Sequence, residues 1–241
     1  MKSVSMGGLA AVLTGGTDRE GGGTGPLVVL LHGFGAPGDD LVSLHRVIEV
    51  PTGTRFLFPV APLTLPPAYG AGRAWWHIDM ALLDRAMREG TVRDLSRDVP
   101  EGLVEARAKV QALLAEAKAT LSPSSIVLGG FSQGAMLSCD VALHSDVPLG
   151  GLVLLSGTLL AEDDWTARMP ARKGLPVLQS HGRQDPILAF EMAERLRDLL
   201  KTAGLDVTWI PFNGGHGIPP AALDGLRPFL AKALAPVSHT S

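Results

Sequence analysis

Short apolar runs without polar interruption recur along this chain, and they limit its fold more than any other feature. A run such as Leu27–Leu31, five aliphatic residues in a row, has no polar face to turn toward water. It is typical of a strand buried on both faces, as in parallel sheets covered by helices. Six such runs are bounded by turn-forming residues, at Leu27–Leu31, Arg55–Phe58, Ile126–Leu128, Leu152–Leu155, Val177–Gln179 and Val207–Ile210. The sequence therefore predicts a mostly parallel central sheet.

Segments with helical periodicity lie between these predicted strands. The clearest is Pro100–Leu121, where apolar residues recur at steps of three and four and form one stripe. Leu188–Ala203 and Ala221–Leu234 are predicted as two further helices, and Gly204 suits the end of the first. Strands alternating with helices predict an α/β fold with helices on both faces of the sheet. No internal repeat or long linker divides the chain, so residues 1–241 are expected to form a single domain.

Composition and charge argue against several classes of protein. Hydrophobic residues make up 46% of the chain, enough to bury a core, which excludes a disordered chain. The 21 Lys and Arg residues against 24 Asp and Glu residues give a net charge of −3, so no nucleic-acid partner is expected. Cys139 is the only cysteine, which excludes an intramolecular disulfide and a cysteine-based metal site. No apolar stretch suits a signal peptide or stable membrane insertion, and a cytoplasmic protein is expected.

A proline-rich stretch interrupts the alternation of strands and helices after the second predicted strand. Four prolines lie between Pro59 and Pro67, and Trp75 and Trp76 follow, ahead of a polar stretch that reaches Asp98. Long irregular segments inside an α/β domain are commonly functional loops. We therefore expect an excursion from the sheet at about residues 59–98 that forms a lid or a pocket wall.

A serine in a G-x-S-x-G pentapeptide, Gly130-Phe131-Ser132-Gln133-Gly134, is the first candidate catalytic residue. The pattern alone is weak, but here it directly follows the predicted strand Ile126–Leu128 and precedes a helical segment from Ala135. A sharp strand-to-helix turn exposes a serine hydroxyl at the carboxyl edge of a sheet, and flanking glycines let the backbone turn without a Cβ clash. Ser132 is thus a predicted nucleophile. The alternative is a glycine-bearing loop with a capping serine.

A serine nucleophile requires a base, and the base requires a carboxylate that orients it. Where a serine nucleophile stands at such a strand-to-helix turn, the order along the chain is serine, acid, histidine, on loops that follow later strands. Asp185 lies one loop past Val177–Gln179, and His216 lies one loop past Val207–Ile210. We therefore predict Asp185 as the acid and His216 as the base, against a turn-forming Asp-Pro pair and an ordinary loop histidine. His181, at a strand end beside a glycine, is expected to be packed and hydrogen-bonded.

Stabilising the negative charge of a tetrahedral intermediate requires two hydrogen-bond donors. The backbone N–H of Gln133, the residue after the predicted nucleophile, is one expected donor. The loop His32-Gly33-Phe34-Gly35 after the first predicted strand is expected to supply the other, because its glycines let a backbone N–H face the site. This loop has no P-loop lysine, which disfavours nucleotide binding.

Together these motifs resemble the carboxylesterase/phospholipase and acyl-protein thioesterase group of α/β-hydrolases. The motifs occur in that group's order from about residue 25 to 234: His32-Gly33-Phe34-Gly35, Arg73-Ala74-Trp75-Trp76, Gly130-Phe131-Ser132-Gln133-Gly134, Ser156-Gly157, His181-Gly182 with Asp185-Pro186, and Gly215-His216. The resemblance implies an α/β-hydrolase fold with Ser132, Asp185 and His216 as catalytic residues. It also implies that the backbone N–H of Phe34, where leucine is more usual, is the second oxyanion donor.

The resemblance further places the tryptophan pair beside the active site. Trp75, Trp76 and Ile187 are accordingly expected to be substrate-binding. Adjacent residues of an extended loop point in opposite directions, so one indole is expected to face the substrate and the other to pack inward. The family's R-A-W-F-D stretch is Arg73-Ala74-Trp75-Trp76-His77 here, and the segment that follows is longer.

The expected function is that of a serine carboxylesterase, which hydrolyses carboxylic esters through an acyl-enzyme intermediate. A wall of indoles together with Phe34 would favour short acyl or aromatic groups. No cofactor or metal is implied, and the expected partner is a small-molecule ester. A lysophospholipase or an acyl-protein thioesterase is the alternative within enzymes, and a non-catalytic or slow-hydrolysing ligand receptor is the alternative outside them. The acyl chain length and the oligomeric state do not follow from the sequence.

Overall fold

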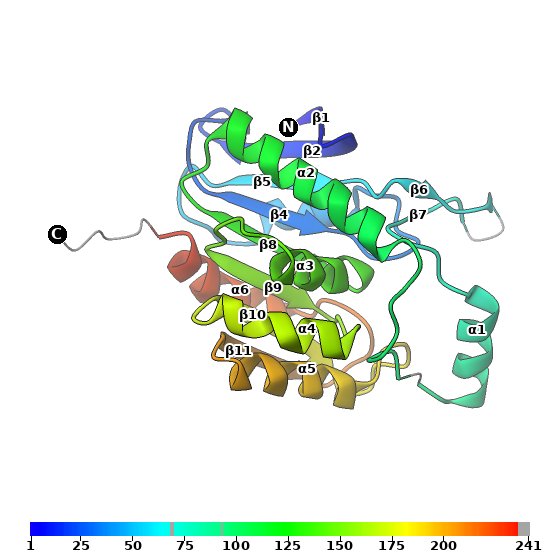
Figure 1. Cartoon of the computed structure of the whole chain (residues 1–241). Helices are drawn as coiled ribbons and strands as arrows, with labels where there is room; N and C mark the ends of the chain where they lie inside the picture. The colour runs from blue at the N-terminus through cyan, green and yellow to red at the C-terminus, as the bar shows by residue number, and fades with distance from the viewer. Residues whose placement is uncertain (68–69, 93, 236–241) are drawn as a thin grey trace.

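One mixed sheet organises the protein, whose computed structural model describes residues 1–67, 70–92 and 94–235. Within these residues its strands follow the order β1-β2-β5-β4-β8-β9-β10-β11, with β3 paired to β2 (Figure 1). The bounds are β1 Lys2–Met6, β2 Leu9–Gly16, β3 Glu20–Gly22, β4 Leu27–Leu31, β5 Arg55–Pro59, β8 Ile126–Phe131, β9 Gly151–Leu155, β10 Pro176–Gly182 and β11 Asp206–Phe212. The last six residues, which the sequence predicts to be a frayed tail, lie outside the described part.

All six predicted strands are confirmed, and from β5 to β11 every neighbouring pair is parallel. Several strands are longer than the apolar runs that predict them, because they continue past the run at the carboxyl edge. Strand β10, for example, includes Ser180-His181-Gly182, and β8 continues to Phe131. An apolar run therefore marks the buried middle of a strand and not its functional end.

An antiparallel hairpin at the N-terminus extends the sheet, and the sequence analysis did not predict it. Strand β2 pairs antiparallel with both β1 and β5. Gly7, at the turn between β1 and β2, has a φ of 59°, and a Cβ there would lie 2.2 Å from the backbone nitrogen of Leu113. The turn therefore packs directly on a helix, and only glycine fits at that point.

Helices cover both faces of the sheet, as predicted. Figure 1 shows α2, α3, α4 and α5 on one face and α6 on the other. The side chains of β8 explain this arrangement, because Leu128 packs in the core under α2 and α3 while its neighbour Val127 packs in the core under α6. The bounds are α1 Met80–Glu89, α2 Leu103–Leu121, α3 Gln133–Leu143, α4 Glu162–Arg168, α5 Phe190–Thr202 and α6 Pro220–Ala233.

The three predicted helices correspond to α2, α5 and α6, with small shifts at their ends. Helix α2 begins at Leu103 and not at Pro100, because Gly102 before it has a φ of 89°, outside the helical region. Gly204 follows α5 with a φ of 88°, and the backbone N–H of Leu205 donates to Leu200 O at 3.0 Å. This is a glycine-terminated helix end of the expected kind.

The predicted excursion at residues 59–98 contains a helix where the sequence analysis expected a polar irregular stretch. Helix α1 stands apart from the sheet at the edge of the molecule (Figure 1). Asp79 caps it, since its Oδ1 accepts the backbone N–H of Leu82 at 3.0 Å. A small hairpin of β6, Leu63–Thr64, and β7, Arg73–Ala74, precedes α1. Residues 68, 69 and 93 of the excursion lie outside the described part.

The carboxyl ends of the parallel strands bring the predicted site residues to one edge of the sheet. In register, Leu31 at the end of β4 lies beside Gly130 of β8, and Gly182 at the end of β10 lies beside Phe212 of β11. The loops that leave these four strands carry the predicted oxyanion loop, nucleophile, acid and base. The sheet topology therefore gathers residues that are up to about 180 positions apart in the chain.

Candidate active site

Ser132 stands at a sharp turn between β8 and α3. Its φ of 54° and ψ of −119° are unusual for a residue with a side chain, and backbone strain of this kind costs on the order of 1–3 kcal/mol. The backbone N–H of Ser132 donates to Leu155 O at 2.9 Å, and its carbonyl accepts the N–H groups of Ala135 and Met136 at 3.0 and 3.1 Å. These bonds on both sides of the residue hold the turn in its strained form.

The two glycines of the pentapeptide make room for that turn. A Cβ on Gly134 would lie 2.1 Å from Leu31 O, and a Cβ on Gly130 would lie 2.6 Å from the same oxygen. No side chain fits at these distances. The glycines let α3 begin directly against the end of β4, which brings Ser132 close to the loop that follows β4.

Asp185 and His216 meet across the loops that follow β10 and β11. The Nδ1 atom of His216 lies 2.7 Å from Asp185 Oδ2, a short hydrogen bond. Asp185 Oδ1 accepts the backbone N–H groups of Ile187 and Leu188 at 2.9 and 3.0 Å. The carboxyl side chain is fully buried, while the imidazole of His216 stays 13% exposed. His216 can therefore reach a ligand that Asp185 cannot touch.

Hydrogen bonds keep Asp185 ionised although it is buried. Burial alone would raise the pKa of this carboxyl, but the hydrogen bonds from His181 and His216 and the backbone N–H of Leu188 outweigh it. They hold the pKa of Asp185 well below its usual range. The carboxylate is thus a permanent acceptor for the imidazole N–H at neutral pH.

The loop that carries His216 is tied to the neighbouring strands. Ser156, directly after β9, donates its hydroxyl to Gly217 O at 2.9 Å. The ring of Phe131 lies 4.9 Å from the imidazole of His216, centroid to centroid. These contacts fix both the backbone and the ring of the predicted base. This contact of Ser156 was not predicted from the sequence, although Ser156-Gly157 is one of the motifs of the family resemblance.

His181 is buried and hydrogen-bonded, as predicted. Its Nε2 atom lies 2.9 Å from Leu188 O and 3.3 Å from Asp185 Oδ2. His181 thus lies behind the Asp185–His216 pair and not in the cavity.

The loop after β4 forms the opposite side of the site. His32 is 1% exposed, its Nε2 accepts the backbone N–H of Ala61 at 3.0 Å, and its Nδ1 lies 2.7 Å from Gly33 O. Burial lowers the pKa of His32, so the neutral ring is the stable form. The backbone N–H of Gly35 donates to Arg73 O at 2.9 Å, and the two preceding residues of the loop, Gly33 and Phe34, border the cavity.

Gln133 has a second attachment that the sequence analysis missed. As the first residue of α3, its backbone N–H belongs to the group that a helix leaves without an internal partner. Its fully buried side chain accepts the backbone N–H of Trp75 through Oε1 and donates to Trp76 O through Nε2, both at 2.9 Å. The sequence carries no signal of this contact, because Gln133 is 58 residues from Trp75 and 57 from Trp76.

Of the two adjacent tryptophans, only Trp76 borders the cavity. Trp76 lines it, whereas Trp75 is 1% exposed and donates its indole N–H to His32 O at 2.9 Å. Trp75, which the sequence analysis expects to bind substrate, does not line this cavity, and its ring lies 5.5 Å from the imidazole of His32, centroid to centroid. Ile187, the third expected substrate-binding residue, lines the cavity.

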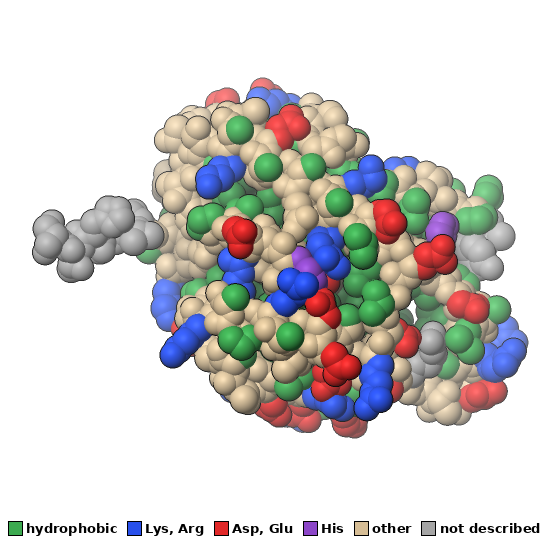
Figure 2. Space-filling view, in the orientation of Figure 1, with side chains coloured by type: hydrophobic (Ala, Val, Ile, Leu, Met, Phe, Trp, Pro, Cys, Tyr) green, Lys and Arg blue, Asp and Glu red, His purple; other side chains and the backbone are tan. Residues whose placement is uncertain are grey.

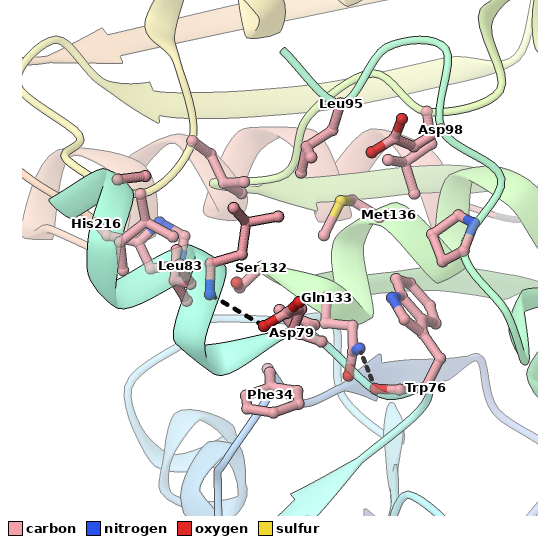
Figure 3. A pocket seen from close by; sticks show the side chains of 18 of the residues that line it. Phe34, Trp76, Asp79, Leu83, Leu95, Asp98, Ser132, Gln133, Met136 and His216 are labelled. Carbon is pink, nitrogen blue, oxygen red and sulfur yellow. Dashed lines mark hydrogen bonds between the residues drawn. The ribbon is translucent and has the colours of Figure 1, made fainter. Parts of the chain in front are cut away.

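A cavity of about 470 Å³ opens beside Ser132 and His216 (Figure 3). Its wall is mainly apolar, and a large share comes from the excursion at residues 59–98. Figure 2 shows hydrophobic side chains gathered at the hollow between this excursion and the body of the protein. Helix α1 contributes Leu82, Leu83 and Ala86, residues that the sequence analysis did not single out. The other lining residues are Gly33, Phe34, Trp76, His77, Ile78, Asp79, Thr91, Leu95, Asp98, Val99, Pro100, Phe131, Ser132, Gln133, Met136, Leu160, Pro186, Ile187, Leu188 and His216.

The described residues include neither a cluster of metal-ligating side chains nor a helix that could span a membrane. They contain no group of three or more His, Cys, Asp or Glu side chains arranged to hold a metal ion. Likewise, none of the helices described is long and apolar enough to cross a membrane.

The sheet order and the strained serine at a strand-to-helix turn define an α/β-hydrolase. More specifically, the chain belongs to the phospholipase/carboxylesterase family, whose model matches residues 20–234. It is therefore a serine hydrolase of carboxylic esters. An acyl-protein thioesterase 1 of Gibberella zeae is 32% identical over 87% of this chain and 91% of its own length.

Two further relatives agree with this assignment. A probable carboxylesterase of Oryza sativa subsp. japonica is 30% identical over 86% of this chain and 92% of its own length. Among solved structures, that of esterase PE8 is similar with a TM-score of 0.76 and 28% identity, over 94% of this chain and 98% of that one.

Proposed function

We propose that this protein hydrolyses carboxylic esters through an acyl-enzyme intermediate on Ser132, with His216 as base and Asp185 as orienting acid. The observation that carries the proposal is the 2.7 Å hydrogen bond between His216 and Asp185 in a site where Ser132 and His216 line one cavity. A histidine whose Nδ1–H is held by a carboxylate leaves Nε2 free to accept a proton from a hydroxyl.

The reaction divides into acylation and deacylation. In the first step His216 Nε2 takes the hydroxyl proton of Ser132 as Oγ attacks the ester carbonyl carbon, and the same proton passes to the departing alkoxide. In the second step His216 takes a proton from a water that attacks the acyl-enzyme, and returns it to Ser132 Oγ as the acid leaves. The backbone N–H groups of Gln133 and Phe34 stabilise the oxyanion in both steps.

The excursion at residues 59–98 supplies the pocket wall for the acyl group. Its contribution to the cavity, from Trp76 to Asp98, supports this role. Trp76 and Phe34 are rigid aromatic boundaries, and together they favour short acyl or aromatic groups over long flexible chains.

Single-domain organisation and a cytoplasmic location stay predictions.

A fatty-acyl thioester is the second candidate substrate. Leu82, Leu83 and Ala86 of α1 extend the apolar lining beyond Trp76, which favours a longer acyl group. The thioesterase relatives of similar length point the same way. The two candidates differ in the length of the chain that the cavity accepts, and they predict different rankings within one substrate series.

The test combines active-site labelling with a substrate series. A fluorophosphonate should label the wild type and not Ser132→Ala, and kcat should fall by about 10⁴–10⁶-fold in the variant with the fold intact by circular dichroism. Residual activity within tenfold of the wild type would contradict the proposed nucleophile. Comparing kcat/KM for p-nitrophenyl acetate, butyrate, octanoate and palmitate with a palmitoyl thioester then separates the esterase from the thioesterase.

A further inference from the structure

We propose that His181 is a positioning residue that holds the carboxylate of Asp185 toward His216. Its Nε2–H lies between Asp185 Oδ2 and Leu188 O, at the two ends of the turn that carries the acid. The proposal rests on the proposed function, because it assumes that Asp185 orients a catalytic His216. It assigns work to a buried imidazole that takes no part in the reaction steps above.

The surroundings of His181 determine which of its nitrogens carries the hydrogen. The ring is fully buried, and Leu188 O, 2.9 Å from Nε2, can only accept. Nε2 must therefore be the donor. The Nδ1 atom is buried and has no hydrogen-bond partner among the described residues, so a second hydrogen there would be a buried donor without an acceptor. The Nε2–H tautomer fits this environment, with Leu188 O as the hydrogen-bond acceptor at 2.9 Å and Asp185 Oδ2 as a second, longer polar contact at 3.3 Å.

The carboxylate of Asp185 is held from both sides by this arrangement. Oδ1 accepts the backbone N–H groups of Ile187 and Leu188, while Oδ2 faces the N–H groups of His216 and His181. With donors at each oxygen, rotation of the carboxylate would break several contacts at once. The backbone bonds alone fix Oδ1, whereas His181 also fixes the side of Oδ2 that His216 leaves open.

His181 also fixes the backbone that follows the acid. Its bond to Leu188 O joins β10 to residue 188, three positions beyond Asp185. Ile187 and Leu188 line the cavity, so the same imidazole connects the acid to one wall of the substrate site. His181 and Leu188 are only seven residues apart and belong to the same loop region, so a single substitution can interrupt the connection.

Two titratable groups face Asp185, His181 from β10 and His216 from the loop after β11. Without the hydrogen bond from His181, burial would weigh more heavily on the carboxylate and its pKa would rise. Activity that depends on ionised Asp185 would then be lost at a higher pH on the acid side. A histidine that only fills space would leave the pH profile unchanged.

The first test compares two amides at the same buried position. The side-chain nitrogen of glutamine reaches about as far as Nε2 of histidine, whereas that of asparagine reaches about as far as Nδ1. His181→Gln should keep at least a third of the wild-type kcat, and His181→Asn should lose about 10–100-fold, a range typical of supporting partners around a site. KM for a soluble p-nitrophenyl ester should change less than about threefold in both. Equal kcat values for the two variants, per fluorophosphonate-titrated site, would overturn the proposal.

The second test removes the donor and keeps the ring. His181→Phe should lose kcat as His181→Asn does, and the acid limb of its pH–kcat/KM profile should move to higher pH. His45→Phe is the control at a half-buried histidine: the His45 ring lies 6.4 Å from Phe56, as the His181 ring lies 6.2 Å from Phe190, and it also contacts a backbone carbonyl. The control should keep the wild-type profile. A wild-type kcat and profile in His181→Phe would reduce His181 to packing, whatever its melting temperature.

Ser132→Ala, measured in the same series, tests the proposed catalytic residues separately from the role of His181. If Ser132→Ala stays active, the proposed catalytic residues are wrong and the positioning role falls with them. If Ser132→Ala is inactive and the His181 variants match the wild type, the triad stands and only the role of His181 is refuted.

Discussion

The two adjacent tryptophans should respond in opposite ways to the same substitution. Trp75 packs beside His32 with its indole N–H bonded to His32 O, while Trp76 borders the cavity. Trp75→Ala should therefore destabilise the fold and leave the acyl chain-length preference unchanged. Trp76→Ala should shift the preference toward longer acyl groups at a smaller cost in stability.

The expected loss for Trp75→Ala follows from its burial. Removing a buried tryptophan side chain costs about 3–5 kcal/mol, and the upper end applies here because His32 O also loses its donor. In a protein of this size each kcal/mol lowers Tm by about 2–4 °C, so a fall of about 10–20 °C is expected. The Trp76 ring already borders a void on one side and gives up fewer packing contacts, so less than half of that fall is expected.

The expected shift for Trp76→Ala follows from the width of the acyl site. Each additional methylene that a pocket accommodates contributes about 1–3 kcal/mol to discrimination. The ratio of kcat/KM for octanoate to that for acetate should rise by about tenfold or more. The assay is the p-nitrophenyl ester series on fluorophosphonate-titrated enzyme, with Tm from differential scanning fluorimetry. An unchanged ratio in Trp76→Ala, or a matching shift in Trp75→Ala, would refute the reasoning.

Three other predictions concern one residue each. The pKa of Asp185 is lowered in the folded state, so the stability that its carboxylate contributes is complete above the unfolded pKa of about 3.9 and is lost as the pH falls below that value. The difference in unfolding free energy between wild type and Asp185→Asn should therefore narrow below about pH 4 in urea titrations. A constant difference would contradict this. Burial, with a smaller effect from Asp140, raises the pKa of the Cys139 thiol, so iodoacetamide at pH 8 should modify Cys139 only after denaturation; rapid labelling of the native protein would exclude a buried thiol. Gln133→Met should leave the N–H of Trp75 and the carbonyl of Trp76 without partners, at a cost in stability of about 1–3 kcal/mol each, so Tm should fall. An unchanged Tm would show that the two side-chain hydrogen bonds of Gln133 do not stabilise the fold.

The central sheet and the location of the candidate site could be predicted from sequence alone. Continuous aliphatic runs such as Leu27–Leu31 can only be buried on both faces, so they determine the parallel strands without knowledge of their neighbours. The order of serine, aspartate and histidine on loops after successive strands is equally local information. Because parallel strands end at one edge, that order already predicts that Ser132, Asp185 and His216 lie near one another.

The tertiary structure alone decided the parts of the site that depend on contacts between distant segments. One example is the placement of the two tryptophans relative to the cavity. Gln133, 57 and 58 residues away, bonds to the backbones of both, and the indole of Trp75 bonds to His32 O. Helix α1 has few features that predict its function from sequence, and its role becomes visible only from the apolar side chains with which it lines the cavity beside Ser132. Likewise, His181 is an ordinary strand-end histidine in the sequence, and only the turn that brings Asp185 and Leu188 back onto its ring makes it a donor to the acid. Local patterns determine which segments are buried, whereas the partners of a buried polar group are set by segments that meet only after folding.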